Sequence, residues 1–169
     1  AHRAEKTIGR ALKSVANQTR IPAEIIVVDD GSKDGTALAA EVMRDCIGGI
    51  NLKVLRQDHQ GAGAARNTAL REARLEYVAF LDADDEWLPE KLERSMQVIS
   101  QTDSILVSHD YIRREQNGRE TIINDCSRKF SRCNEPYLEL YRLGYIATSG
   151  VVARREAVIA AGGFDETLQ

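Results

Sequence analysis

The chain has 169 residues, of which 43% are hydrophobic and 29% are charged, and its formal net charge is −3. These values are ordinary for one soluble globular domain, and they give no electrostatic reason to expect a nucleic-acid partner. No apolar run approaches the ~20 residues of a membrane-spanning helix. The three cysteines lack metal-type spacing, so reduced thiols in a cytosolic compartment are expected.

In the first two thirds of the chain, patterns with the helical period alternate with short continuous apolar runs. Such runs suit strands that are covered on both faces. Pro22 ends one helical pattern and Pro89 fits the first turn of another. The expected elements in chain order are a helix with Ile8, Leu12 and Val15 on its inner face, a strand over 24–28, a helix over about 36–46 with Leu38, Val42 and Met43 inward, a strand over 52–55, a helix over 64–74, a strand over 77–81, a helix after Pro89 with Leu92, Met96 and Ile99 inward, and a strand over 104–108.

This alternation predicts an α/β fold whose sheet is mostly parallel, with right-handed crossovers. The last third is more irregular. There Asn117-Gly118 stands between two short β-branched runs and predicts a hairpin with a type I′ turn. No linker or repeat divides the chain, so a single domain over residues 1–169 is expected. The remaining expected elements are a helix over 135–143, a strand over 147–153 and a helix over 154–161.

An acidic turn follows the strand over 77–81. Asp82, Asp84 and Asp85 stand at its carboxyl end, where ligands bind in open α/β sheets. Clustered carboxylates repel one another unless something positive lies between them, and Mg²⁺ or Mn²⁺ would neutralise them through oxygen ligands. The alternative is a polar turn whose aspartates cap the helix after Pro89.

Two other loops are expected at the same edge of the sheet. Asp29-Asp30 ends the strand over 24–28, and the loop G-A-G-A-A-R-N over 61–67 opens a helix. The start of a helix favours anions, and Arg66 can bind phosphate oxygens with its guanidinium. The loop lacks the Lys-Ser/Thr ending of a Walker motif and does not directly follow a strand as a dinucleotide GxGxxG does. Carboxylates for a metal and an arginine together suit a diphosphate.

Taken in order, these motifs resemble those of family 2 glycosyltransferases of the GT-A fold. The resemblance covers nearly the whole chain and implies a Rossmann-like mixed sheet with helices on both faces. Each motif is modest evidence, but their shared order and spacing are specific. They are found at 4–8, 14–19, 24–36 (E-I-I-V-V-D-D-G-S-K-D-G-T), 61–67, 82–85 (D-A-D-D) and 162–166 (G-G-F-D-E).

The resemblance implies roles for individual residues. Asp30 corresponds to a residue that hydrogen-bonds the nucleotide base, usually uracil. His2 takes the place of a tyrosine that stacks on the base, a departure that leaves the identity of the base open. Arg66 corresponds to a residue close to the diphosphate. Asp82 and Asp84 match the DxD motif, with Asp84 as the direct metal ligand and Asp82 nearer the ribose or the metal. Positions near the sugar or the acceptor are matched by Trp87, Phe164 and Asp165.

The reaction implied is transfer of a sugar, with inversion, from a nucleotide-diphosphate sugar to an acceptor hydroxyl. The expected donor is a UDP-sugar, the cofactor is Mg²⁺ or Mn²⁺, and the acceptor is a saccharide or a lipid-linked saccharide, as in polysaccharide biosynthesis. Such an enzyme would work in the cytoplasm or at the inner face of a membrane, and a homo-oligomer is compatible with it. Acceptor choice is expected in the variable region 111–149.

The chain departs from the family at two places. The family has an apolar strand before the region matched by 1–3, and a Glu-Asp pair, whose aspartate is the general base, after the region matched by 162–166. We therefore expect a fragment that is incomplete at both ends, with its base beyond Gln169 and little transfer activity alone. Asp110 and Asp165 are acidic but do not match the base position.

Two other classes of protein remain as alternatives. The first is a non-catalytic nucleotide- or sugar-binding module of the same fold, which the missing base favours. The second is a phospho-accepting receiver domain, because the strand over 24–28 also ends in paired aspartates. A receiver needs a lysine at the end of a later strand, and no expected strand of this chain ends in lysine.

Overall fold

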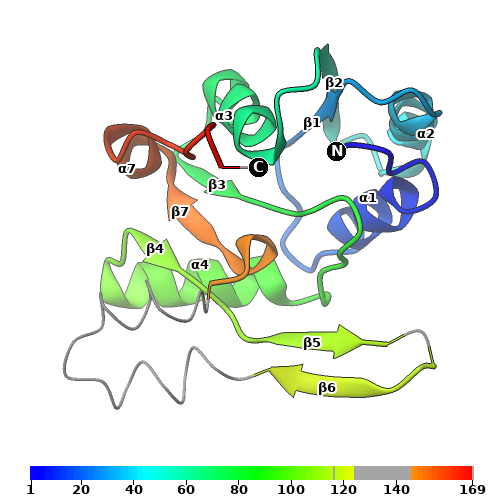
Figure 1. Cartoon of the computed structure of the whole chain (residues 1–169). Helices are drawn as coiled ribbons and strands as arrows, with labels where there is room; N and C mark the ends of the chain where they lie inside the picture. The colour runs from blue at the N-terminus through cyan, green and yellow to red at the C-terminus, as the bar shows by residue number, and fades with distance from the viewer. Residues whose placement is uncertain (116, 124–145, 169) are drawn as a thin grey trace.

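The structure is a computed structural model that describes residues 1–115, 117–123 and 146–168. It contains a parallel pair of strands, a three-stranded antiparallel sheet and a separate hairpin (Figure 1). The described elements are α1 (Ile8–Ala16), β1 (Glu24–Asp30), α2 (Thr36–Val42), η1 (Met43–Cys46), β2 (Asn51–Gln57), α3 (Ala62–Glu72), β3 (Tyr77–Ala79), α4 (Lys91–Thr102), β4 (Leu106–Val107), β5 (Tyr111–Arg114), β6 (Glu120–Ile123), η2 (Thr148–Gly150), β7 (Val152–Arg154) and α7 (Arg155–Ala160).

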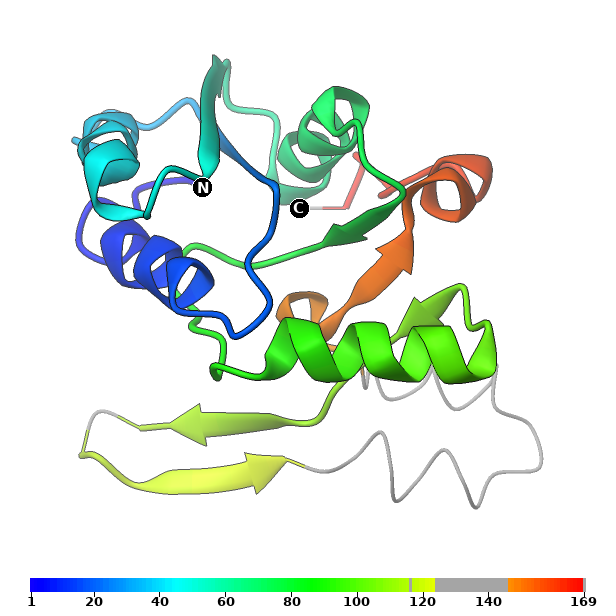
Figure 2. The same ribbon diagram turned by 180° about the vertical axis from the view of Figure 1, so that it is seen from behind.

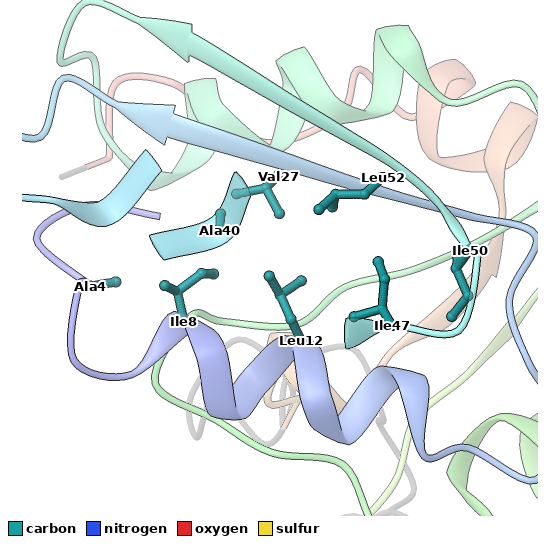
Figure 3. Close-up of a cluster of buried hydrophobic side chains, with 8 residues drawn as sticks. All are labelled: Ala4, Ile8, Leu12, Val27, Ala40, Ile47, Ile50 and Leu52. Atoms are coloured by element: carbon teal, nitrogen blue, oxygen red, sulfur yellow. The ribbon is translucent and has the colours of Figure 1, made fainter. Parts of the chain in front are cut away.

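The first half of the chain is built on the parallel pair β1 and β2, which are in register from Glu24↔Asn51 to Asp30↔Gln57. Helix α1 covers one face of the pair, and Ile8 and Leu12 point from it toward the strands (Figure 3). Between Glu24 and its final aspartates, β1 is continuously apolar, which suits a strand covered on both faces. The buried cluster consists of Ala4, Ile8, Leu12, Val27, Ala40, Ile47, Ile50 and Leu52.

Helix α2 presents its small residues to the core, which corrects the expected helix phase. Leu38 and Val42 were expected to point inward, but they are 65% and 64% exposed. The buried residues of this helix are Thr36, Ala37 and Ala40. The Thr36 hydroxyl oxygen accepts a hydrogen bond from the Ala4 amide (2.8 Å). This long-range bond fixes Thr36 on the inside, and the 3.6-residue period then places positions 38 and 42 outside.

The second half is built around β7, which lies between β3 and β4 and runs antiparallel to both. Helices and strands alternate along the chain, which confirms the mixed α/β class. The prediction of a mostly parallel sheet is wrong for the described strands, because only β1 and β2 pair in parallel. The strand expected over 147–153 begins instead with the short helix η2. Helix α4, drawn at the front in Figure 2, packs against this sheet. Its expected inner residues Leu92 and Ile99 are buried with Val152.

The hairpin of β5 and β6 forms as expected, with Tyr111 opposite Ile123, but its turn differs from the type I′ prediction. The Gly118 amide donates to the Glu115 carbonyl (2.9 Å), so Gly118 closes the turn instead of occupying its centre. Gly118 has φ +82°, whereas the described non-glycine residues with positive φ do not include Asn117. The helix expected over 135–143 lies outside the described residues.

A cavity of about 1030 Å³ separates β1 from β3. Its walls include the inner parts of both strands and the start of the chain. The Ala1 amino group donates to the Val28 carbonyl (2.7 Å), and the Asp30 amide donates to the Ala1 carbonyl (2.8 Å). These two bonds have the pattern of a parallel β-bridge. Ala1 thus pairs with the edge of β1 that β2 leaves free.

Lys91, at the start of α4, is a buried cation. It is only 9% exposed, its Nζ atom lies 4.0 Å from the centre of the Trp87 ring, and it donates to the Val151 carbonyl (3.4 Å). Burial lowers the pKa of Lys91 to about 7, while the ring face offsets part of that cost by favouring the cation. An unfolded chain would retain this proton up to about pH 10.

We expect Lys91→Met to be more stable than the wild type at pH 6, by about 1–3 kcal/mol. Since the unfolded state binds more protons than the folded state between the two pKa values, wild-type stability rises from about pH 7 to pH 10. The advantage of the variant should therefore shrink over that range. Urea unfolding at several pH values measures the effect, with exposed Lys13→Met as the control. If the stability difference between Lys91→Met and the wild type increased toward pH 10, the lowered pKa of Lys91 would be contradicted.

Candidate functional site

The cavity between β1 and β3 gathers most of the residues that the sequence singles out. Six of the eight predicted site residues line it, from the ends of β1 and β3, the start of the chain and α3. The strands β1 and β3 belong to different sheets, so these residues share a cavity and not, as expected, one edge of a common sheet. The lining set is His2, Asp30, Arg66, Asp82, Asp84 and Trp87.

The Asp30 side chain is 2% exposed and is fully hydrogen-bonded within the chain. Its Oδ1 atom accepts from Gln57 Nε2 (2.8 Å) and the Gln60 amide (2.9 Å). Its Oδ2 atom accepts from the Gly61 amide (2.9 Å) and is hydrogen-bonded to His59 Nδ1 (2.8 Å). Burial alone would raise the pKa of this carboxyl, but the four hydrogen bonds outweigh it and the pKa is lowered. Asp30 thus holds the loop after β2 against the end of β1.

His2 lies beside Asp30, and its ring contacts another histidine. Its Nδ1 atom is hydrogen-bonded to the Asp30 carbonyl (2.7 Å), and its ring stacks on that of His59 with centroids 4.2 Å apart. The approach of the two loops requires glycine at position 31, because a Cβ there would lie 2.6 Å from the His59 amide nitrogen. Gly31 also has φ +68°, which side chains disfavour.

His2, Asp30 and His59 are residue types that can bind a metal, and their ligand atoms all lie within 4.8 Å of one another. No other such group of three is found in the described part of the chain. Two imidazoles and a carboxylate would suit a zinc-like ion rather than Mg²⁺ or Mn²⁺. However, both Nδ1 atoms already bond to Asp30. In the structure, the set forms a hydrogen-bonded junction of two loops.

In the acidic turn after β3, Asp82 forms an ion pair with Arg66, whereas the carboxylate of Asp84 is exposed. Arg66 Nη2 contacts Asp82 Oδ1 at 2.5 Å, and the Asp85 amide donates to the Asp82 carbonyl (3.1 Å). The Asp84 side chain is exposed, and no described residue hydrogen-bonds or pairs with its carboxylate. Asp84 is consequently the carboxylate best able to accept an incoming cation.

The chemistry of this turn fits a hard divalent cation. Mg²⁺ is usually bound by one or two carboxylates together with substrate phosphates and waters. Asp84 supplies a free carboxylate and Asp82 keeps one oxygen away from Arg66. Both oxygens are hard ligands in a partly solvated cavity. These residues could hold Mg²⁺ or Mn²⁺ in company with a bound phosphate group.

Phe164 belongs to a segment that is fastened to α3. The Asn67 amide group donates to the Phe164 carbonyl (2.8 Å) and accepts from the Phe164 amide (2.8 Å). The Phe164 ring meets Phe80 edge to face at 5.0 Å, and the Arg66 guanidinium lies 5.4 Å from its centre. The ring therefore packs beneath Arg66 and supports it.

Asp165 is exposed, and its carboxylate is hydrogen-bonded to the nearby Thr167. Its Oδ1 atom accepts hydrogen bonds from the Thr167 hydroxyl (2.6 Å) and amide (2.8 Å), which lower its pKa. Its carbonyl passes so close to α3 that a Cβ at Gly63 would lie 2.8 Å from it. The second glycine of the 61–67 loop is therefore needed for contact with the segment 163–166. Neither Phe164 nor Asp165 is among the residues that line the cavity.

Trp87 was predicted on the acceptor side, but its indole N–H is hydrogen-bonded within the protein. Its indole N–H donates to the Ser149 carbonyl (2.7 Å), and its amide donates to Ser14 Oγ (3.0 Å). Its ring carries Lys91 on one face and packs against the core of the second half. Trp87 thus connects the acidic turn to α1, α4 and η2.

Sequence reasoning assigns no role to His59, Asn67 or Ser149. A signal exists for the first two, since His59 precedes the glycine loop and Asn67 ends the same motif. Ser149 carries no local signal, because its partners are 62 to 67 positions away in the sequence.

Solved structures share the fold of this chain. The chain is similar to S. aureus TarS in complex with UDP, with a TM-score of 0.76 and 27% identity, over 99% of this chain and 49% of that one. It is also similar to TarS in complex with UDP-GlcNAc, with a TM-score of 0.74 and 26% identity, over 97% and 46% of the two chains. The fold is that of the GT-A glycosyltransferases, as the resemblance implied.

The family model "Glycosyl transferase family 2" matches residues 1–160, and the chain belongs to that family. An uncharacterised glycosyltransferase of Nostoc sp. is 34% identical over 89% of this chain and 48% of its own length. The UDP-Glc:alpha-D-GlcNAc-diphosphoundecaprenol beta-1,3-glucosyltransferase WfgD of Escherichia coli is 37% identical over 59% of this chain and 38% of its own length. The chain thus spans less than half of the length of these relatives. No helix in the described ranges has both the length and the apolar character needed to cross a membrane.

Proposed function

We propose that this chain is the donor-binding part of a glycosyltransferase that transfers a sugar, with inversion, from a UDP-sugar to an acceptor hydroxyl. The observation that carries the proposal is the convergence of Asp30, Arg66, Asp82 and Asp84 on one cavity in a chain of glycosyl transferase family 2. The UDP and UDP-GlcNAc complexes of TarS support the class of donor. The name of WfgD, a relative, supports a lipid-linked saccharide as the acceptor.

In this proposal the nucleotide base lies at the Asp30 end of the cavity and the diphosphate lies near Arg66. A carboxylate offers about four acceptor positions, and Asp30 uses all four within the chain. A base N–H can therefore reach Asp30 only by replacing one donor. His59 is the donor best placed to leave, because its side chain is 60% exposed.

At the other end of the cavity, Arg66 would share its guanidinium between Asp82 and the diphosphate. A divalent ion held by Asp84 and Asp82 would offset the charge that develops on the leaving diphosphate. The acceptor hydroxyl also needs a general base within hydrogen-bond reach. The Asp165 carboxylate is a poor base because its hydrogen bonds from Thr167 lower its pKa. We therefore do not assign the base to Asp165.

Calorimetric titration of UDP in the presence of Mn²⁺ and in the presence of EDTA tests the proposal. We expect UDP to bind more tightly with Mn²⁺, because the metal bridges carboxylates and phosphates that would otherwise repel one another. Uridine should gain little from Mn²⁺, since it lacks phosphates. Equal UDP affinity in both buffers would remove the metal from the proposal, and binding of no nucleotide would exclude a donor site in this chain.

A further inference from the structure

Ser149 joins the short helix η2 to the acidic turn after β3. Its hydroxyl donates to Asp85 Oδ2 (2.6 Å) and accepts from the Asp82 amide (3.0 Å). Its carbonyl accepts from the Trp87 indole N–H (2.7 Å). One buried serine, 9% exposed, therefore bonds to three residues within the span 82–87.

The helix η2 is closed by its own backbone hydrogen bonds and packs against a neighbouring segment. The Gly150 amide donates to the Ala147 carbonyl (2.9 Å) and the Val151 amide to the Thr148 carbonyl (3.0 Å). A Cβ at Gly150 would lie only 3.0 Å from the His109 carbonyl oxygen, which shows how closely η2 packs on the segment after β4. The helix that carries Ser149 is thus packed against the segment after β4 as well as against the acidic turn.

We propose that Ser149 is a positioning residue for the acidic turn. By donating to Asp85, it directs the Asp85 carboxylate toward η2, and by accepting from the Asp82 amide, it fixes the backbone from which Asp82 and Asp84 project. Without the hydroxyl, one described backbone bond, from the Asp85 amide to the Asp82 carbonyl, would still close the turn. The consequence for metal binding rests on the proposed function, whereas the consequence for the order of the turn does not.

Hydrogen exchange on the protein without ligand tests the positioning directly. In Ser149→Ala, the amides of 82–85 should exchange at least about tenfold faster, because the Asp82 amide loses its acceptor. Exchange within α4 should stay unchanged. Ser149→Thr, which retains the hydroxyl, should restore slow exchange. Unchanged exchange at 82–85 in Ser149→Ala would overturn the proposal, whatever the protein binds.

UDP titrations with Mn²⁺ and with EDTA then separate positioning from general stability. Ser149→Ala should reduce the Mn²⁺-dependent gain in UDP affinity about tenfold, as changes to residues that orient metal ligands commonly do, and should leave the affinity in EDTA unchanged. The control is Ser95→Ala, which removes a fully buried hydroxyl bonded to the Lys91 carbonyl and to His109. A lower melting temperature without a change in the Mn²⁺-dependent gain would limit Ser149 to a structural role. A wild type without any Mn²⁺-dependent gain would instead refute the proposed function.

Discussion

Asp84→Asn should remove most of the Mn²⁺-dependent part of UDP binding, lowering that part by about 100-fold or more. The estimate exceeds the roughly 10–100-fold cost of changing a residue that only orients a metal ligand, because Asp84 is the proposed ligand itself. Its carboxylate is exposed and meets no partner among the described residues, so the substitution breaks no bond of the fold in that part of the chain. Calorimetry with Mn²⁺ and with EDTA measures the change.

The matched control is Glu86→Gln, which removes one negative charge two positions away. Glu86 forms a surface ion pair with Arg10 (3.1 Å), and such pairs contribute little to stability. The control should keep wild-type UDP affinity in both buffers. If Asp84→Asn also bound UDP and Mn²⁺ as the wild type does, Asp84 would have to be removed from the site. A loss of equal size in Glu86→Gln would mean that net charge alone attracts the metal.

Arg66→Ala should weaken UDP binding by about 10- to 100-fold, which corresponds to the roughly 1.5–3 kcal/mol of a hydrogen bond to a charged group. The Arg66 side chain is 25% exposed, and its guanidinium lies above Phe164 and is directed at Asp82, so it is preorganised at the phosphate end of the cavity. Uridine, which has no phosphate, should bind to the variant and to the wild type with similar affinity. Calorimetry with both ligands measures this difference.

The control for this experiment is Arg71→Ala on the same helix. The Arg71 side chain is 65% exposed and lies 4.0 Å from Glu166, so its loss should affect neither ligand. Arg66→Ala also leaves Asp82 without its partner, and a melting curve should be recorded to exclude unfolding. If uridine and UDP lost affinity equally, Arg66 would be supporting the cavity as a whole instead of binding the diphosphate.

Part of the candidate site was predictable because its signals are local. The strand over 24–28 and the strand over 77–81 are both followed by aspartates, and ligands bind at the carboxyl ends of strands in open α/β sheets. Arg66 was predictable because a glycine loop at the start of a helix suits a phosphate. The structure places these residues around one cavity. Their roles toward metal and nucleotide remain predictions.

The bonding of Asp30 could not be read from the sequence. An aspartate after an apolar strand looks the same whether it meets a ligand or internal donors. Here the donors come from the end of β2 and the loop that follows it, 27 to 31 positions away. The same holds for Trp87, whose indole N–H is used by the Ser149 carbonyl 62 positions away. A ligand that binds Asp30 or the Trp87 indole N–H must therefore replace a hydrogen bond that the fold already makes.

Sequence patterns alone were enough to predict the family, the order of helices and strands in the first two thirds of the chain, and the positions of the acidic turn and the glycine loop. These features depend on periods of two to four residues and on backbone conformations that particular residues favour. Only the tertiary structure decided that β7 lies between β3 and β4, that Thr36 sets the phase of α2, and that Ser149 supports the acidic turn. Each of these is a contact between segments far apart in the chain, and a pattern of neighbouring residues carries no information about which distant segment will supply the partner.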